Sequence, residues 1–178
     1  KYYFIKYQNN KNLLHQIQFN KKLINIGISL FSKNEIKNWK LKKWSELLIL
    51  IQNYCSKSKF YFYGGKDDFN KVNDFLRKNK KINAKNLCGL HGLKSDIFLI
   101  SKMNYFISID TGNAHIASIL KIPTFVIKLS NSLKGHWDQL NSTTMNSSCD
   151  CQGKGFKACE LNQRKCIMSL SPSLVLKN

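Results

Sequence analysis

Short apolar runs alternate with amphipathic stretches along most of the chain. Where apolar residues recur three or four positions apart, the pattern predicts helices at 41–54, 67–78, 93–103 and 113–120. In the third helix we expect Leu93, Ile97 and Ile100 to face inward. Continuous apolar runs bounded by polar residues or glycine predict strands at 23–30, 59–63, 86–90, 105–109 and 123–129. This alternation predicts an α/β fold, a Rossmann-like parallel sheet with helices on both faces.

Two stretches of different composition flank this pattern. Residues 1–22 are polar and basic, and we interpret them as a linker or the end of a missing N-terminal domain. Residues 23–145 form the Rossmann-like domain, although the segment after Ser130 is expected to be a loop or a small appended element. Residues 146–178 are predicted to be a cysteine-containing tail and the start of a C-terminal helix. Because the first residue is Lys1 and the last helix looks cut off, we expect a fragment or a processed piece.

The chain is strongly basic, with 29 Lys and Arg against 10 Asp and Glu and a formal net charge of +19. Such a charge suits a nucleic acid or an anionic membrane. However, only two of these basic residues are arginines, Arg77 and Arg164. Sites selected to bind phosphate favour Arg, because its planar guanidinium group can form two parallel hydrogen bonds. A general bias towards Lys, Asn and Ile explains the composition better. We expect no nucleic-acid partner, and a peripheral contact with anionic lipid as a secondary effect.

Polar loops follow three of the predicted strands. In open α/β sheets, ligands bind at the carboxyl ends of the strands. We therefore expect these loops to converge on one rim and to form a ligand site there. They are SKNEIKNW at 32–39, GGKDD at 64–68 and DTGNAH at 110–115.

The loop after the fourth predicted strand is the most informative. Asp110 ends the strand, Thr111 and Gly112 make the turn, and a helix begins near Asn113. Gly112 lets a ligand approach the backbone closely. The free N–H groups of the new helix favour a phosphate or diphosphate, to which His115 adds a side-chain donor. The alternative is a plain strand-to-helix turn with a capping side chain.

Two further charged residues lie on the same rim. Lys37 can neutralise a phosphate, although a chain so rich in Lys makes an accidental match easy. Asp68 either complements the dipole of the helix that it begins or accepts hydrogen bonds from a ribose. The sequence contains neither the dinucleotide fingerprint G-x-G-x-x-G, nor the P-loop, nor the G-x-S-x-G elbow.

In their order along the chain, these motifs resemble the C-terminal half of the lipopolysaccharide heptosyltransferases, glycosyltransferase family nine. The resemblance covers about residues 24–176, and D-T-G-x-x-H is its most specific part. Two positions depart from the family pattern, with Lys40 where Pro is common and Asp68 where Glu is frequent. The matching pieces are K-x-W at Lys37 and Trp39, a second Trp at Trp44, GG-x-D-D at 64–68, L-x-G-L-x-x-L at 87–93, DTGNAH-x-A at 110–117, K-I-P-T at 121–124 and C-x6-C-I-M-S-L-S-P-x-x-V at 159–175.

The resemblance implies a two-domain GT-B glycosyltransferase whose C-terminal domain binds the donor, usually ADP-heptose. Residues 23–145 would then be the nucleotide-sugar-binding domain, and transfer would proceed with inversion and with no metal or other cofactor. Lys37 and the helix N-terminus would stabilise the leaving diphosphate electrostatically. The implied donor contacts are Ser32, Lys37, Asp68, Asp110, Thr111, Gly112 and His115.

The resemblance also implies an acceptor and a location. The acceptor would be a lipid-linked or lipopolysaccharide-type glycan held by a missing N-terminal domain, which also carries the catalytic base. We therefore expect this chain alone to be inactive, and expect it in the bacterial cytoplasm or peripherally on the inner face of the inner membrane. One alternative is a non-catalytic nucleotide-sugar-binding module. Another is a basic nucleic-acid or membrane-surface protein, which lacks the interleaved aromatic and Arg pattern of single-strand binders.

Four cysteines cluster near the end of the chain. Zinc sites usually contain pairs spaced C-x2–4-C, which these spacings match poorly. A disulfide is the second alternative, but free thiols are favoured in a cytosolic protein. We therefore predict no metal site. The four residues are Cys149, Cys151, Cys159 and Cys166.

Overall fold

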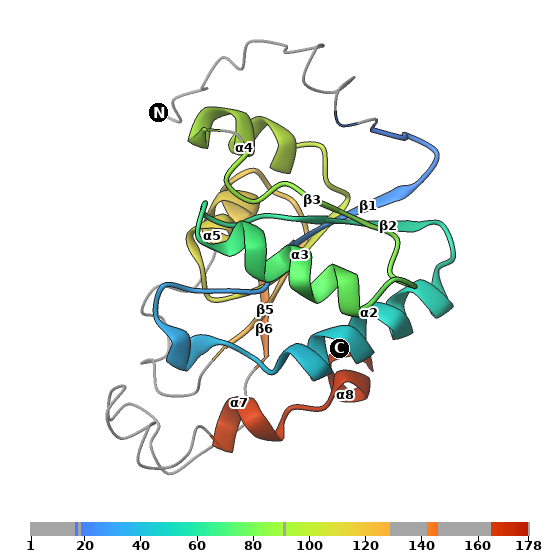
Figure 1. The fold of residues 1–178 in the computed structure, drawn as a ribbon, viewed down its shortest axis with the longest axis vertical. Helices are drawn as coiled ribbons and strands as arrows, with labels where there is room; N and C mark the ends of the chain where they lie inside the picture. Colours follow the sequence, from blue (N-terminus) through green and yellow to red (C-terminus); the bar gives the residue numbers. More distant parts are fainter. Residues whose placement is uncertain (1–16, 18, 91, 129–141, 146–164, 178) are drawn as a thin grey trace.

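The computed structural model describes residues 17, 19–90, 92–128, 142–145 and 165–177. Within these residues the centre is a sheet of six strands, and every neighbouring pair is parallel. The spatial order is β3-β2-β1-β4-β5-β6. In Figure 1, β1, β2 and β3 lie side by side near the middle of the view. The predicted Rossmann-like α/β fold is therefore confirmed. The strands are β1 (Ile24–Ser29), β2 (Ser58–Phe62), β3 (Ala84–Asn86), β4 (Tyr105–Ile109), β5 (Thr124–Ile127) and β6 (Ser142–Met145).

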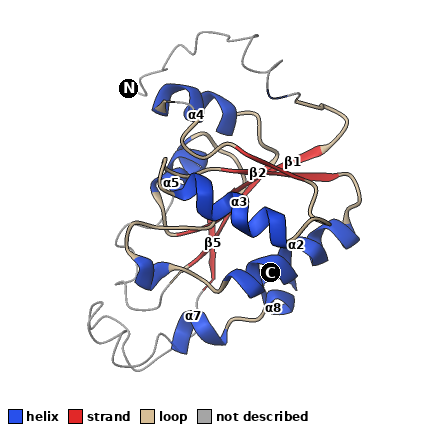
Figure 2. Cartoon of the chain, viewed as in Figure 1, coloured by secondary structure: helices blue, strands red, loops and turns tan. Residues whose placement is uncertain are grey.

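Helices cover both faces of the sheet (Figure 2). The side chains of β2 show the two faces, because successive residues of a strand point in opposite directions. Phe60 and Phe62 pack in the cluster that contains the buried residues of α2 and α3, whereas Tyr61 packs with those of α4 and α5. The helices on the first face are α2 (Leu41–Tyr54) and α3 (Asp68–Lys78), and those on the second are α4 (Leu93–Ile100) and α5 (Gly112–Ile119).

The order in which strands are added to the sheet reverses between β1 and β4, which are parallel neighbours at the middle of the sheet. After β1 the chain builds β2 and β3 on one side, and after β4 it builds β5 and β6 on the other. The loops that leave these two strands therefore diverge. In sheets of this order the resulting crevice at the carboxyl ends is where ligands bind. The loop after β1 contains a short 3-10 turn, η1 (Glu35–Lys37).

Three local predictions were wrong. β3 ends at Asn86 instead of beginning there, because the buried Leu87 and Cys88 lie in the turn that follows the strand. β6 is a sixth strand of the main sheet in the segment that we expected to be a loop or a small appended element, since its sequence STTM has no apolar run and it pairs only with β5 among the described strands. Leu93, expected to face inward, is 65% exposed at the start of α4, which buries Phe98, Leu99 and Ile100 instead.

Two short helices near the C-terminus, α7 (Lys165–Ser169) and α8 (Pro172–Lys177), pack against the main domain. Ile167, Leu170 and Val175 are buried in the same cluster as the core residues of α2. The ammonium of Lys43 in α2 donates hydrogen bonds to the carbonyl oxygens of Met168 and Leu170. The described C-terminal residues therefore share the core of the domain, and the division at residue 146 stays a prediction.

Little of the predicted linker at 1–22 falls within the described residues. Ile17 is buried, and Phe19 stacks on Tyr61 with ring centroids 4.9 Å apart. Residues 1–16 and 18 lie outside the described residues, so the predicted nature of this stretch stays a prediction. In the part of the chain that the structure describes, no helix has the length and apolar character needed to cross a membrane.

Candidate functional site

The loop after β1 holds Lys37 at the carboxyl edge of the sheet. The side chain of Asn34 caps η1 by accepting a hydrogen bond from the N–H of Ile36 at 3.2 Å. The N–H of Ser32 donates to Oδ1 of Asn38 at 2.8 Å, which closes the loop on itself. Ile36 is buried and anchors the turn to the core. These contacts fix the backbone from which the Lys37 side chain extends.

The loop after β4 leads directly into α5, and the first turn of this helix forms hydrogen bonds with residues of β1 and β4. Thr111 is the N-cap, and its Oγ1 accepts from the N–H of Ala114 at 3.4 Å. The hydroxyl groups of Ser108 and Thr111 lie 3.0 Å apart. This local chemistry explains why the sequence turns here, because Thr satisfies an N–H that the first helical turn cannot pair.

Gly112 is the first residue of α5, and it opens onto free space. A methyl group built at this position would meet no described atom within 4 Å. The backbone N–H groups of Gly112 and Asn113 have no acceptor among the described residues. Such N–H groups, with the positive end of the helix dipole behind them, attract anions. The turn therefore exposes N–H groups of the kind that bind anions, and anion binding here stays a prediction.

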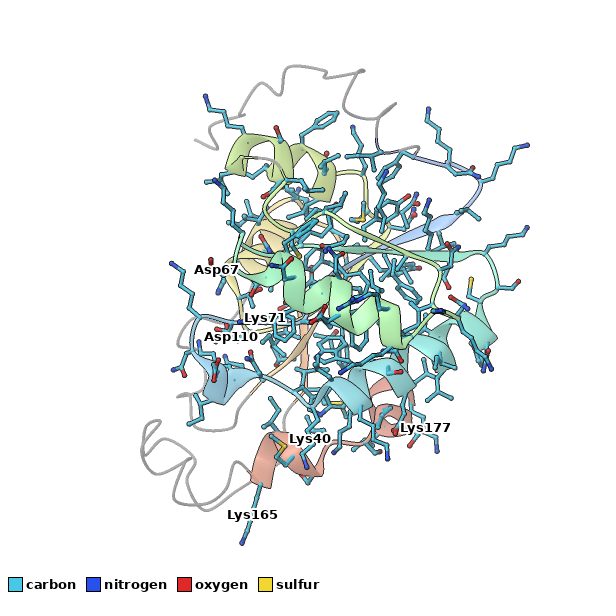
Figure 3. All side chains as sticks on the ribbon, viewed as in Figure 1. Lys40, Asp67, Lys71, Asp110, Lys165 and Lys177 are labelled. Atoms are coloured by element: carbon cyan, nitrogen blue, oxygen red, sulfur yellow. The ribbon has the colours of Figure 1, made fainter. Side chains whose placement is uncertain are left out.

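Lys37 and Asp110 meet at the carboxyl ends of β1 and β4. The Nζ of Lys37 lies 2.8 Å from Oδ2 of Asp110, and the two residues are 73 positions apart in sequence. The Nε2 of His115, on the first turns of α5, lies 3.7 Å from Oδ1 of the same carboxylate. The side chains of Lys37 and Asp110 are 25% and 17% exposed, so the pair is partly shielded from water. Figure 3 shows Asp110 at the edge of the sheet where η1 lies.

Asp68 belongs to the loop after β2, and its carboxylate is engaged locally. Oδ2 accepts a hydrogen bond from the N–H of Gly65 at 2.9 Å, and Oδ1 lies 4.0 Å from the Nζ of Lys71. Gly89, with φ of +63°, brings the loop after β3 against this one, and any side chain there would come within 2.5 Å of the Cα of Lys66. Asp68 is thus held at the rim without a described contact to Lys37 or Asp110.

The structure brings five of the seven predicted residues together and leaves two apart. The group that meets at the crevice is Lys37, Asp110, Thr111, Gly112 and His115. Ser32 supports the loop through its backbone and through Oγ, which accepts from the N–H of Asn34 at 3.3 Å. Asp68 stabilises its own loop, which fits the interpretation of a first-turn acid as well as it fits a ribose contact.

Sequence reasoning missed three polar residues that support this site. Ser29 is the last residue of β1 and Ser108 the second-last of β4; they are 1% and 0% exposed, and Asn113 donates to the Oγ of Ser29 at 3.1 Å. The available signal was a Ser at the carboxyl end of each of the two strands that flank the switch point. A serine in an apolar run is not informative until its neighbours in space are known.

Two hollows lie outside this crevice. One of about 340 Å³ lies beside η1 and is lined by Phe31, Trp39 and Lys71 among others. A larger, mainly apolar one of about 1220 Å³ lies against the first residues of β1, β4 and β5, between α2 and α8. None of the seven predicted donor residues lines either hollow.

The predicted absence of a metal site is not tested at the cysteines. In the described part of the chain, no three His, Cys, Asp or Glu side chains gather as metal ligands would. Cys149, Cys151 and Cys159 lie outside the described residues, and Cys166 is described only as part of α7. The prediction of free thiols therefore stays a prediction.

Comparison with known proteins identifies the family to which the chain is similar. It matches the family model of glycosyltransferase family 9 (heptosyltransferase) over residues 1–154. It is 25% identical over 146 residues to lipooligosaccharide heptosyltransferase 2 of Campylobacter jejuni, which covers 79% of this chain and 45% of that protein. The chain thus spans about half the length of the curated relatives it matches.

Solved structures share the fold. The ADP-heptose lipopolysaccharide heptosyltransferase II of E. coli superposes with a TM-score of 0.74 at 16% identity, over 93% of this chain and 48% of that one. A family 9 glycosyltransferase from Veillonella parvula gives the same TM-score and shares of the chains at 15% identity. The E. coli heptosyltransferase WaaC, solved with ADP, gives 0.62 at 14% identity, over 85% and 47%. With its Rossmann-like parallel sheet and a family match over most of its length, the chain belongs to glycosyltransferase family 9, the heptosyltransferase family.

Proposed function

We propose that this chain is the donor-binding half of an inverting glycosyltransferase that uses an ADP-heptose-like nucleotide sugar. The observation that carries the proposal is the meeting of Lys37, Asp110 and the N-terminus of α5 at the switch point of the sheet. A cation and two backbone N–H groups with no acceptor among the described residues suit a diphosphate there, and switch points are where nucleotides bind in such sheets. Family membership and a relative solved with ADP support the same ligand.

Each residue has a stated task in this proposal. The N–H groups of Gly112 and Asn113 donate to the diphosphate, and Lys37 shares its charge between the diphosphate and Asp110. Asp110 keeps the ammonium aimed into the crevice, and His115 adds a further donor. When the sugar leaves, negative charge grows on the diphosphate, and donors already in place stabilise it without reorganisation. The contacts are all protein groups, so we expect no metal requirement.

The acceptor lies outside this half. The chain spans about half of the relatives' length, and we propose that the other half holds a lipopolysaccharide-type or related surface-glycan acceptor and the catalytic base. Positioning two substrates supplies on the order of 7–11 kcal/mol of an enzyme's acceleration in favourable cases. Purified residues 1–178 should therefore show no heptose transfer, and measurable transfer would contradict this part of the proposal. The net charge of +19 favours a place beside anionic lipid at the inner membrane face.

Calorimetric titration with ADP tests the donor site directly. The folded chain should bind ADP in a buffer containing EDTA, and added magnesium should change the affinity little. AMP should bind more weakly, because it lacks the phosphate nearest to Lys37 in this arrangement. A well-folded sample that binds no ADP, or binds it only with metal, would refute the proposal.

A further inference from the structure

The first turn of α5 is anchored to both strands that flank the switch point. Ser29 ends β1, Ser108 lies near the end of β4, and the two are paired in register. Both are buried, at 1% and 0% exposed. The Ser108 hydroxyl lies 3.0 Å from that of the N-cap residue Thr111, and the Ser29 hydroxyl accepts a hydrogen bond from the Nδ2 of Asn113. Each strand thus contacts a different residue of the same helical turn.

The hydrogen bonds around Ser29 have a defined direction. Its hydroxyl donates to the carbonyl oxygen of Tyr63 at 3.1 Å, so its lone pairs remain to accept from Asn113, also at 3.1 Å. Because the proton of the hydroxyl is already used, only a donor at position 113 completes the chain. Tyr63 in turn immediately precedes the loop that carries Asp68. The chain of bonds therefore joins the exits of β1 and β2 to the start of α5.

The same residue whose side chain is tied to Ser29 presents a backbone N–H to the crevice. The N–H groups of Gly112 and Asn113 are those without an acceptor among the described residues. Lys37 reaches the crevice from the loop that begins just after Ser29. The hydrogen bond between Ser29 and Asn113 therefore fixes the distance between the loop that carries Lys37 and the N–H groups that begin α5.

We infer that Asn113 and Ser29 are positioning residues for the diphosphate of the donor. Their hydrogen bond holds the N–H groups of α5 in place opposite Lys37, although Ser29 itself is too deeply buried to touch a ligand. The inference rests on the proposed function, because the diphosphate is the ligand that this turn would meet.

The test compares ADP affinity in four variants of the full chain by calorimetry, well below each unfolding midpoint. Ser29→Ala and Asn113→Ala should each weaken ADP binding about five- to tenfold, which is the usual effect of one lost hydrogen bond. The double variant should lose no more than about tenfold in ADP affinity, since both changes break the same hydrogen bond. Ser29→Thr keeps the hydroxyl and should bind ADP as the unaltered chain does.

Ser118→Ala is the matched control. Ser118 is 1% exposed on the same helix, and its hydroxyl has no partner among the described residues, so its removal should leave ADP affinity within about twofold. A purely structural role for Ser29 would lower the unfolding temperature and leave the affinity of the folded protein unchanged. Unaltered affinity in Ser29→Ala, additive losses in the double variant, or failure of Ser29→Thr to restore binding would overturn the inference. Failure of the unaltered chain to bind ADP would instead refute the proposed function.

Discussion

Replacing Lys37 by Ala removes the cation at the centre of the proposed donor site. Its ammonium lies 2.8 Å from the Asp110 carboxylate, and the side chains of the two residues are 25% and 17% exposed. A hydrogen bond to a charged group contributes about 1.5–3 kcal/mol, so ADP affinity should fall about 10- to 150-fold. We expect the upper half of this range, because the variant removes a positive charge 2.8 Å from Asp110 and so leaves more net negative charge beside the bound diphosphate.

A second variant checks that explanation. In Lys37→Ala with Asp110→Asn, the carboxylate that repels the diphosphate is removed together with the ammonium. The double variant should therefore bind ADP more tightly than Lys37→Ala alone. If Asp110 instead serves only to shape the turn before α5, the double variant should bind more weakly than the single one.

The assay is calorimetric titration at about 0.15 M salt, where long-range attraction to a basic surface is largely screened. AMP affinity should change much less than ADP affinity, because the proposed contact of Lys37 is with the second phosphate, which AMP lacks. Lys78→Ala is the control, since Lys78 is an exposed residue at the end of α3, away from the crevice. Lys71 does not serve this purpose, because it lies 4.0 Å from Asp68 and lines the hollow beside η1. Equal losses in Lys37→Ala and Lys78→Ala would mean that ADP samples a positive surface, and would refute the reasoning.

Three further changes test separate parts of the account. Gly112→Ala should leave the unfolding temperature unchanged or slightly higher, because its methyl group meets no described atom within 4 Å, yet it should weaken ADP binding by intruding where a phosphate would lie; unchanged affinity would argue against that position. Burial raises the pKa of Asp96 from 3.8 to about 6, so the folded chain loses stability as pH rises through this interval. Asp96→Asn should therefore be more stable than the unaltered chain at pH 7, by about 1–2 kcal/mol after allowance for partial exposure. In thermal unfolding scans this difference should vanish below about pH 4. Lys43→Met should lower stability by about 1–3 kcal/mol, because two carbonyl groups at the end of α7 lose their donor, and chemical denaturation showing no loss would contradict that role.

Apolar patterning was sufficient for the central elements of the fold. β4 and α2 have the predicted bounds, because the run YFISI and the spaced Trp44, Leu47 and Leu48 supply side chains to the two clusters that cover the faces of the sheet. β3 and β6 lie at the edges of the sheet, where main-chain pairing decides the structure and side-chain pattern carries little information. Their sequences, AKN and STTM, gave no apolar signal.

The site could be predicted where chemistry and loop position coincide. Asp110, Thr111 and Gly112 form a recognisable strand-to-helix turn, and the alternation of elements places Lys37 on the same rim. The pairing of Lys37 with Asp110 depends on which strands are neighbours, which no local pattern specifies. Ser29 and Asn113 were missed for the same reason, since their contact exists only after β1 and the start of α5 are side by side.

Nuclear magnetic resonance titration of the isotopically labelled chain with ADP, in the presence of EDTA, tests the central claim most directly. The backbone amides of Gly112 and Asn113 should show the largest shifts, together with those of the η1 turn around Lys37, and all should saturate with one affinity. AMP should shift the same amides less. Shifts spread over exposed lysines without saturation, or confined to the apolar hollow between α2 and α8, would contradict a donor site at the switch point.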